Sequence, residues 1–280
     1  MRAPVWIALP ILAAGCAGGS VHHAAKQEQR QAPAQRNVLA SVPSATTTAA
    51  HRRMPKPRRR RVTHGAPPQH PHGVAIPWRR DGVSHVAFVH VKRVAVYRSP
   101  LAGHALLALK RYDGNGTQRA FLVRGTSNGW VHVYLPTRPN GSLGWVRRRA
   151  VRMYTDGYRL VVRLRAHRLQ LWSKRQLLAT YPVAVGTPST PTPRGLYYIV
   201  ELLRPTDPGG SYGPYSFGLS AHSNVLQTFA GGDGRVGLHG TNEPGLIGSS
   251  VSHGCIRLRN ADVRRLAKIL PLGTPVYIRM

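Results

Sequence analysis

The sequence predicts a mainly β protein, in which a small β-barrel domain is followed by a second β-rich domain with one C-terminal helix. Between residues 83 and 153, short segments that alternate apolar and polar side chains are separated by the turn sequences DGNG, SNG and RPNGS. A second series of such segments begins at residue 156. Near the end, the stretch NADVRRLAKIL has apolar residues at the spacing of a helix that buries one face.

The first domain is expected at residues 83–153. The segments HVAFVHV, VAVYRSP, FLVRG, WVHVYLP and GWVRRRAV have the alternation typical of strands, and short strands at this spacing favour a small barrel. Trp130, Tyr134 and Trp145 are either a binding surface or core and rim residues of that barrel. The strings VYRSP, NGWVHVYLP and GWVRRRAV resemble a bacterial Src-homology-3-like domain, which implies a domain that accompanies cell-wall enzymes and binds wall components.

The second domain is expected at residues 156–280. YRLVVRLRAHRLQLWSKRQLLATYPVAVG predicts three consecutive antiparallel strands, and LYYIVELL and TPVYIRM predict two more. In the helix, Asn260 is the expected N-cap, and Pro271 and Gly273 are the expected stop. The apolar stripe consists of Val263, Leu266, Ala267 and Leu270.

Residues 1–17 have the pattern of an export signal, because a basic start is followed by VWIALPILAA, which is too short to span a bilayer comfortably. LAAGC resembles a lipobox, so Cys16 is a candidate for lipidation; ordinary cleavage after Gly15 or Ala17 is the alternative. A disulfide between Cys16 and Cys255 would tie the signal to the far end of the chain and is not expected. We therefore expect an exported protein of the cell envelope, either lipid-anchored or released.

Residues 18–82 are rich in Ala, Pro, Gln, Thr, Arg and His and lack the apolar residues of a core, which predicts a disordered tether. The chain has 40 Lys and Arg against 9 Asp and Glu, a formal charge of +31, and RRMPKPRRRR at residues 52–61 is its densest basic run. Such charge predicts anionic partners. With an export signal present, these are wall polymers or a lipid surface rather than nucleic acid. The sequence says nothing about the oligomeric state.

The string GLHGTNEPGLIGSSVSHGCIRLRN contains the chemistry-bearing residues of the second domain. Cys255 could be a metal ligand with His239 and His253, but no second cysteine pair or H-x-x-x-H spacing supports zinc. It could be a small buried side chain. Gly254 and Ser252 argue against a plain core strand, because a glycine there allows a tight turn whose N–H groups converge on one point.

The third alternative is a nucleophile, which requires a base and a setting that favours the thiolate. By spacing alone, both His239 and His253 qualify as the base, because one lies two residues away and the other could come from a separate strand. Arg257 and Arg259 add positive charge, which is expected to lower the pKa of the thiol.

HGTNEPGLIGSSVSHGCIRL resembles the signature of the L,D-transpeptidase catalytic domain, the YkuD-like family, and YPVAVG, TPRGLYYI and GTPVYI follow that family's order over about 125 residues. The resemblance implies that Cys255 is the nucleophile and His239 the general base, oriented by the backbone carbonyl of Gly240. It implies that the loop of Ser252, His253 and Gly254 shapes an oxyanion hole. It also implies that Arg257 holds a substrate carboxylate or braces the loop.

The mechanism implied is a two-step acyl transfer on peptidoglycan stem peptides. Cys255 attacks the carbonyl of the third residue, D-alanine leaves, and the amine of another stem's third residue takes the acyl group. No metal or other cofactor is needed, and a carbapenem should acylate Cys255. Residues 207–222 are either a lid over the site or an ordinary surface loop. Hydrolysis by an L,D-carboxypeptidase, ligation of a protein to peptidoglycan, and a non-catalytic wall-binding protein are the alternatives.

Overall fold

The computed structural model describes residues 81–229 and 232–280, and these residues belong to one compact unit. The expectations for the export signal, for Cys16 and for the basic tether lie outside the described residues. Within the described ranges, no helix has both the length and the apolar character needed to cross a bilayer.

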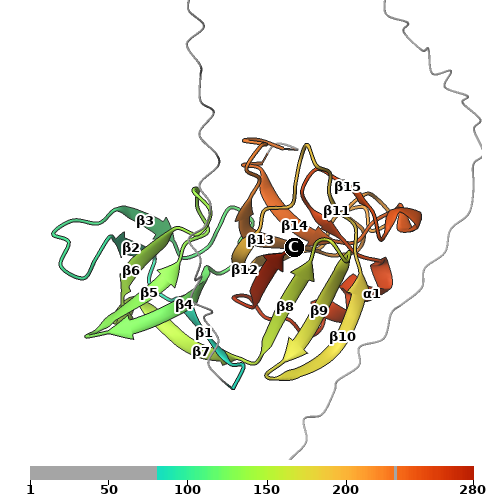
Figure 1. The fold of residues 1–280 in the computed structure, drawn as a ribbon. Helices are drawn as coiled ribbons and strands as arrows, with labels where there is room; N and C mark the ends of the chain where they lie inside the picture. The colour runs from blue at the N-terminus through green and yellow to red at the C-terminus, as the bar shows by residue number, and fades with distance from the viewer. Residues whose placement is uncertain (1–80, 230–231) are drawn as a thin grey trace, which may run out of the picture. The chain divides into compact units, whose positions relative to one another are not determined.

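The first part of the described chain is a seven-stranded sheet in the order β3-β2-β6-β5-β4-β1-β7, with every neighbouring pair antiparallel (Figure 1). A 3-10 turn, Arg148–Ala150, connects β6 to β7 in the chain. The likeness to a Src-homology-3-like domain stays a prediction. The strands are β1 (Ser84–Val89), β2 (Arg93–Tyr97), β3 (Leu107–Lys110), β4 (Ala120–Ser127), β5 (Trp130–Tyr134), β6 (Leu143–Arg147) and β7 (Val151–Asp156).

Two of the three aromatic residues that the sequence analysis selected in this sheet are interior. Trp130 and Tyr134 are buried. Trp130 packs edge-to-face on Tyr97 and carries the Arg147 guanidinium over its ring. Trp145 is half-buried and stacks on His132, with ring centroids 4.3 Å apart. Of the two alternatives left by the sequence, core and rim residues therefore describe these side chains better than a binding surface does.

The second part contains an eight-stranded sheet in the order β10-β9-β8-β17-β12-β13-β14-β16 (Figure 1). Its first three strands in the chain are antiparallel neighbours, as the sequence predicts, and β8/β17 and β14/β16 are parallel pairs. A short parallel pair, β11 (Val185–Gly186) and β15 (Ser250–Ser252), lies apart from it. The strands of the large sheet are β8 (Tyr158–Arg163), β9 (Arg168–Ser173), β10 (Gln176–Pro182), β12 (Gly195–Leu203), β13 (Ser216–His222), β14 (Arg235–His239), β16 (Ile256–Arg257) and β17 (Pro275–Arg279).

The helix α1 (Asn260–Ala267) covers one face of this sheet and buries Val263 and Leu266 in its core. The prediction that Asn260 caps the helix is wrong. Arg259 occupies the N-cap position without a side-chain hydrogen bond, and Asn260 is the first helical residue. The Asn260 side chain instead accepts a hydrogen bond from the backbone N–H of Thr241 at 2.8 Å, so it serves a distant loop rather than its own helix.

The two sheets share buried contacts. Leu122 and Tyr134 of the first sheet lie in one apolar cluster with Leu196, Tyr198 and Val200 of β12. The Tyr198 hydroxyl donates a hydrogen bond to the carbonyl of Tyr134 at 3.0 Å. The first sheet therefore supports β12, which is one of the strands that line the cavity described below.

A loop of the first sheet also holds the connection between β13 and β14. The guanidinium of Arg138 donates hydrogen bonds to the carbonyls of Ser223, Leu226 and Asp233 at 2.7, 2.9 and 3.0 Å. Asn140 next to it bonds the carbonyl and the N–H of His222 at 2.7 and 2.8 Å. Backbone polar groups of a long connection are thus satisfied by side chains from the other sheet.

Candidate active site

Cys255 directly precedes β16, which pairs in parallel with β14 so that Ile256 lies opposite Leu238. This register brings the thiol next to Gly237, whose backbone N–H donates a hydrogen bond to the sulfur with a nitrogen–sulfur distance of 3.3 Å. The side chain of Cys255 borders a cavity of about 640 Å³. The polar donor and the open space beside the sulfur argue against a purely hydrophobic role for Cys255.

The turn before Cys255 is held by the hydroxyl of Ser252. This hydroxyl donates a hydrogen bond to the carbonyl of Cys255 at 2.6 Å and accepts one from the N–H of Gly254 at 3.1 Å. Gly254 has φ = +117°, a conformation that residues with a Cβ rarely adopt. The N–H of Gly254 is thus already used, which corrects its assignment to the oxyanion hole. Among the described residues, the N–H groups of His253 and Cys255 have no acceptor.

His239 is the last residue of β14, and its ring is 4% exposed. Its Nδ1 lies 2.7 Å from the carbonyl oxygen of Gly240. Because a carbonyl only accepts, Nδ1 carries the proton and Nε2 has the free lone pair. Burial lowers the pKa of His239 to about 4; the contact with Gly240 opposes this shift and the positive charge of Arg257 adds to it.

His239 and Cys255 both lie beside Gly237. The Cδ2 atom of His239 lies 3.5 Å from the place a Cβ of Gly237 would take, and the Gly237 N–H contacts the sulfur. Residues 235, 237 and 239 share one face of β14, because side chains alternate along a strand. Gly237 lies between Arg235 and His239 on this face, and it carries no side chain.

The pKa of Cys255 is raised by burial, against the opposing effects of the Gly237 N–H and the Arg257 charge. The expectation of a lowered thiol pKa is therefore wrong. The basic side chains near the site do not compensate for removal of the sulfur from water. With the His239 pKa near 4, the resting pair is a neutral thiol and a neutral imidazole.

The other predicted site residues have different surroundings. His253 is exposed, and its ring packs on that of Phe229 with centroids 5.2 Å apart, which favours His239 over His253 as the partner of the thiol. Arg257 pairs with Glu243 at 2.8 Å and so braces the loop that follows His239. No three Cys, His, Asp or Glu side chains of the described chain are grouped to hold a metal ion.

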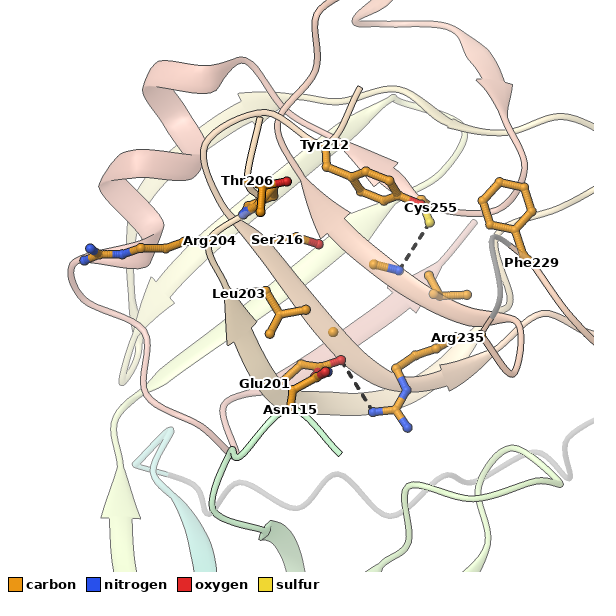
Figure 2. A pocket seen from close by; sticks show the side chains of 15 residues that line it. Asn115, Glu201, Leu203, Arg204, Thr206, Tyr212, Ser216, Phe229, Arg235 and Cys255 are labelled. Carbon is orange, nitrogen blue, oxygen red and sulfur yellow. Dashed lines mark hydrogen bonds and ion pairs between the residues drawn. The ribbon is translucent and has the colours of Figure 1, made fainter. Parts of the chain in front are cut away.

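The cavity extends from Cys255 over the sheet and is lined by residues that the sequence analysis did not select (Figure 2). Tyr212 lies against the sulfur end, with its ring centroid 4.8 Å from that of His239. Glu201, Arg235 and Asn115 lie at the other end. The order of the strands and a turn of the first sheet bring these three residues together. No local sequence motif predicts that they belong to a site.

The segment at residues 207–222 is only partly a loop. From Ser216 onward it is strand β13, so neither alternative, a lid or an ordinary surface loop, is right for that half. The loop before it, with Tyr212, is packed on the turn after His239: a Cβ on Gly213 or on Gly240 would overlap the side-chain oxygen of Asn260. The bond from Asn260 to Thr241 thus positions both the Tyr212 loop and the carbonyl that orients His239.

Comparison with known proteins identifies a family for the second part of the chain. Residues 157–278 match the YkuD family, the L,D-transpeptidase catalytic domain. YkuD of Bacillus licheniformis is 44% identical over 44% of this chain and 67% of its own, and YkuD of Bacillus subtilis is 42% identical over 45% and 68%. Among solved structures, Bd1075 of Bdellovibrio bacteriovorus is 26% identical with a TM-score of 0.36, over 44% of this chain and about half (47%) of that one. The chain belongs to the YkuD family of L,D-transpeptidases.

Proposed function

We propose that this protein cross-links the third residues of two peptidoglycan stem peptides through a thioester on Cys255, with His239 as general base and acid. The observation that supports this most strongly is the position of the Cys255 sulfur and the buried His239 imidazole on either side of Gly237, with the sulfur bordering a cavity of about 640 Å³. Membership of the YkuD family supports the reaction class.

The first half-reaction begins from the neutral pair. Nε2 of His239 accepts the thiol proton as the sulfur attacks the carbonyl carbon of the third residue, and the carbonyl oxygen becomes an oxyanion. The N–H groups of His253 and Cys255 are the donors left to stabilise that oxyanion. The bond to D-alanine then breaks, its amine takes the proton from His239, and an acyl-thioester remains on Cys255.

In the second half-reaction, the side-chain amine of another stem's third residue attacks the thioester. Nε2 of His239 accepts a proton from that amine, the carbon–sulfur bond breaks, and the sulfur regains the proton. The product is an amide between two third-position residues, and the pair returns to its neutral form. The bond from Nδ1 to Gly240 keeps the same nitrogen available in both halves.

The acceptor distinguishes the remaining alternatives. Water would give an L,D-carboxypeptidase, and a protein amine would attach that protein to the wall. A non-catalytic wall-binding protein would need neither Cys255 nor His239. For localisation, we propose the outer side of the membrane, where peptidoglycan lies, and the basic tether would meet anionic wall polymers or lipid there.

The test is incubation of the full chain with purified tetrapeptide muropeptides, followed by mass spectrometry. A dimer that lacks one D-alanine is expected, together with a carbapenem adduct on the peptide that contains Cys255. Cys255→Ala should abolish both, whereas Asp262→Asn, a charge change on α1, should abolish neither. Tripeptide monomers alone would establish hydrolysis instead, and full turnover by Cys255→Ala would refute the catalytic proposal.

A further inference from the structure

The end of the cavity away from Cys255 contains a buried carboxylate and a guanidinium (Figure 2). Glu201 of β12 is 7% exposed. Its Oε2 accepts a hydrogen bond from the side-chain amide of Asn115 at 2.7 Å, and its Oε1 lies 3.7 Å from Nη1 of Arg235. Asn115 belongs to the turn between β3 and β4, so the first sheet contributes directly to this end of the cavity.

The sheet is shaped to receive the Glu201 side chain. Glu201, Gly218 and Gly237 are cross-strand partners in one row over β12, β13 and β14. A Cβ on Gly218 would lie 2.6 Å from Cγ of Glu201 and would overlap its carboxylate, so the carboxylate lies above Gly218. The next position of the row is Gly237, whose N–H contacts the sulfur of Cys255. No side chain of the row separates the carboxylate from the reacting sulfur.

The spacing between the Glu201 carboxylate and Gly237 is close to the length of the side chain of a diamino dicarboxylic acid. Neighbouring strands are about 4.8 Å apart, so the carboxylate above Gly218 lies roughly one strand spacing from Gly237. In a 2,6-diamino dicarboxylic acid, five carbon–carbon bonds separate the reacting carbonyl carbon from the carbon that bears the second ammonium and carboxylate. An extended chain of five such bonds spans about 6 Å. A donor with its carbonyl at Cys255 would thus bring that carbon to Glu201 and Arg235.

Arg235 has donors available for such a group. Its distances of 3.7 Å to Glu201 and 3.6 Å to Asp233 are those of charge attraction rather than of short hydrogen bonds. Its side chain is 30% exposed, so the guanidinium is open to the cavity that it lines. A planar guanidinium binds a carboxylate through two parallel N–H bonds.

We propose that Glu201 and Arg235 bind the charged end of the donor's third residue, with its ammonium on Glu201 and its carboxylate on Arg235, while Asn115 positions Glu201. This inference rests on the proposed transpeptidase function and extends it to a substrate class. The enzyme selects donor stems with a diamino dicarboxylic acid, such as diaminopimelate, over stems with lysine at the third position. Lysine offers the ammonium alone and leaves Arg235 without its ligand.

The test compares two tetrapeptide donors, one with diaminopimelate and one with lysine, through release of D-alanine. The wild-type protein should show kcat/KM at least about 10-fold higher for the diaminopimelate donor. Arg235→Gln should lower this value to about that of the lysine donor, so that the preference between the two donors is lost. Glu201→Gln should lower both. Arg264→Gln on α1 is the matched control and should preserve the preference.

Carbapenem acylation of Cys255 distinguishes failure of the subsite from failure of the proposed function, because a carbapenem lacks the diamino acid side chain. If the wild-type protein is acylated but uses both donors equally, or if Arg235→Gln lowers both donors equally, the subsite is refuted and the proposed function stands. If the folded wild-type protein is neither acylated nor active on either donor, the proposed function fails. Thermal melting monitors the folding of each variant. If Arg235→Gln unfolds, Arg235→Lys replaces it, because lysine keeps the positive charge but cannot form the two parallel hydrogen bonds. An intermediate preference for the diaminopimelate donor is then expected.

Discussion

Protonation of His239 should destabilise the folded protein as the pH is lowered from 7 to 4. Burial lowers the pKa of His239 to about 4, whereas an unfolded histidine titrates near 6.5. The difference of about 2.5 pH units corresponds to about 3 kcal/mol, at 1.36 kcal/mol per unit. Between these two pH values the unfolded chain binds the proton and the folded protein does not. The free energy of unfolding therefore falls as the pH is lowered through this window, and it is unaffected by His239 above it.

The measurement is urea unfolding of the wild-type protein and of His239→Gln at pH 7, 6, 5 and 4. The wild-type protein should lose about 3 kcal/mol more than the variant between pH 7 and pH 4. The pKa of His222 is also lowered by burial, but this residue is present in both proteins and its effect cancels. NMR titration of the His239 ring gives its pKa directly. Parallel pH profiles of the two proteins, or a titration of His239 near 6.5, would refute the reasoning.

The same charge state has a kinetic consequence. A neutral thiol beside a neutral imidazole predicts that thiolate absorbance near 240 nm, taken as the difference from Cys255→Ala, is absent at pH 7 and appears only above the usual thiol range. Acylation of Cys255 by a carbapenem should decline at acid pH with a midpoint near 4, where His239 becomes protonated. Strong thiolate absorbance at pH 7 would indicate a preformed ion pair and contradict this mechanism.

Three substitutions test the turn that positions the thiol and the connection between β13 and β14. Gly254→Ala places a Cβ at φ = +117°, which should reduce the free energy of unfolding by about 1–3 kcal/mol. The variant should also slow acylation of Cys255 at least about 10-fold. Acylation at the wild-type rate would contradict this expectation. Ser252→Ala removes both hydrogen bonds that hold the turn, with a similar loss in urea unfolding, and an unchanged midpoint would count against that role. Arg138→Ala should increase hydrogen exchange in residues 223–229 while β8 and β9 stay protected, and uniform protection would show that the clamp is unimportant.

Local patterns account for most of the strands that the sequence predicts. The alternation across residues 158–182 depends only on neighbouring side chains, and β8, β9 and β10 occur there as expected. Asn260 shows where local reasoning fails. Its position before an apolar stripe favours an N-cap, but the amide of Thr241, from a distant loop, binds its side chain. A tertiary contact therefore overrides a capping preference of about 1 kcal/mol.

Some residues of the candidate site can be predicted from local sequence, and others cannot. Cys255 and His239 lie in short motifs, so their sequence context alone selects them. The pKa of the thiol depends on burial, which no motif reports, and the nearby positive charges gave the wrong direction. Glu201, Arg235 and Asn115 have unremarkable local sequence. They converge only because β12, β13 and β14 are neighbours and because a turn of the other sheet reaches them.

The large sheet explains why the core and the candidate site arise from the same alternation. On β13 and β14, every second residue is apolar and buried in the core: Phe217, Leu219, Val236 and Leu238. The intervening positions on the opposite face include Gly218 and Gly237, and a side chain at Gly218 would overlap the carboxylate of Glu201. One face thus stabilises the fold, while small residues on the other leave backbone N–H groups and open space. The proposed nucleophile, the proposed base and the proposed zwitterion-binding pair therefore require no departure from ordinary strand periodicity.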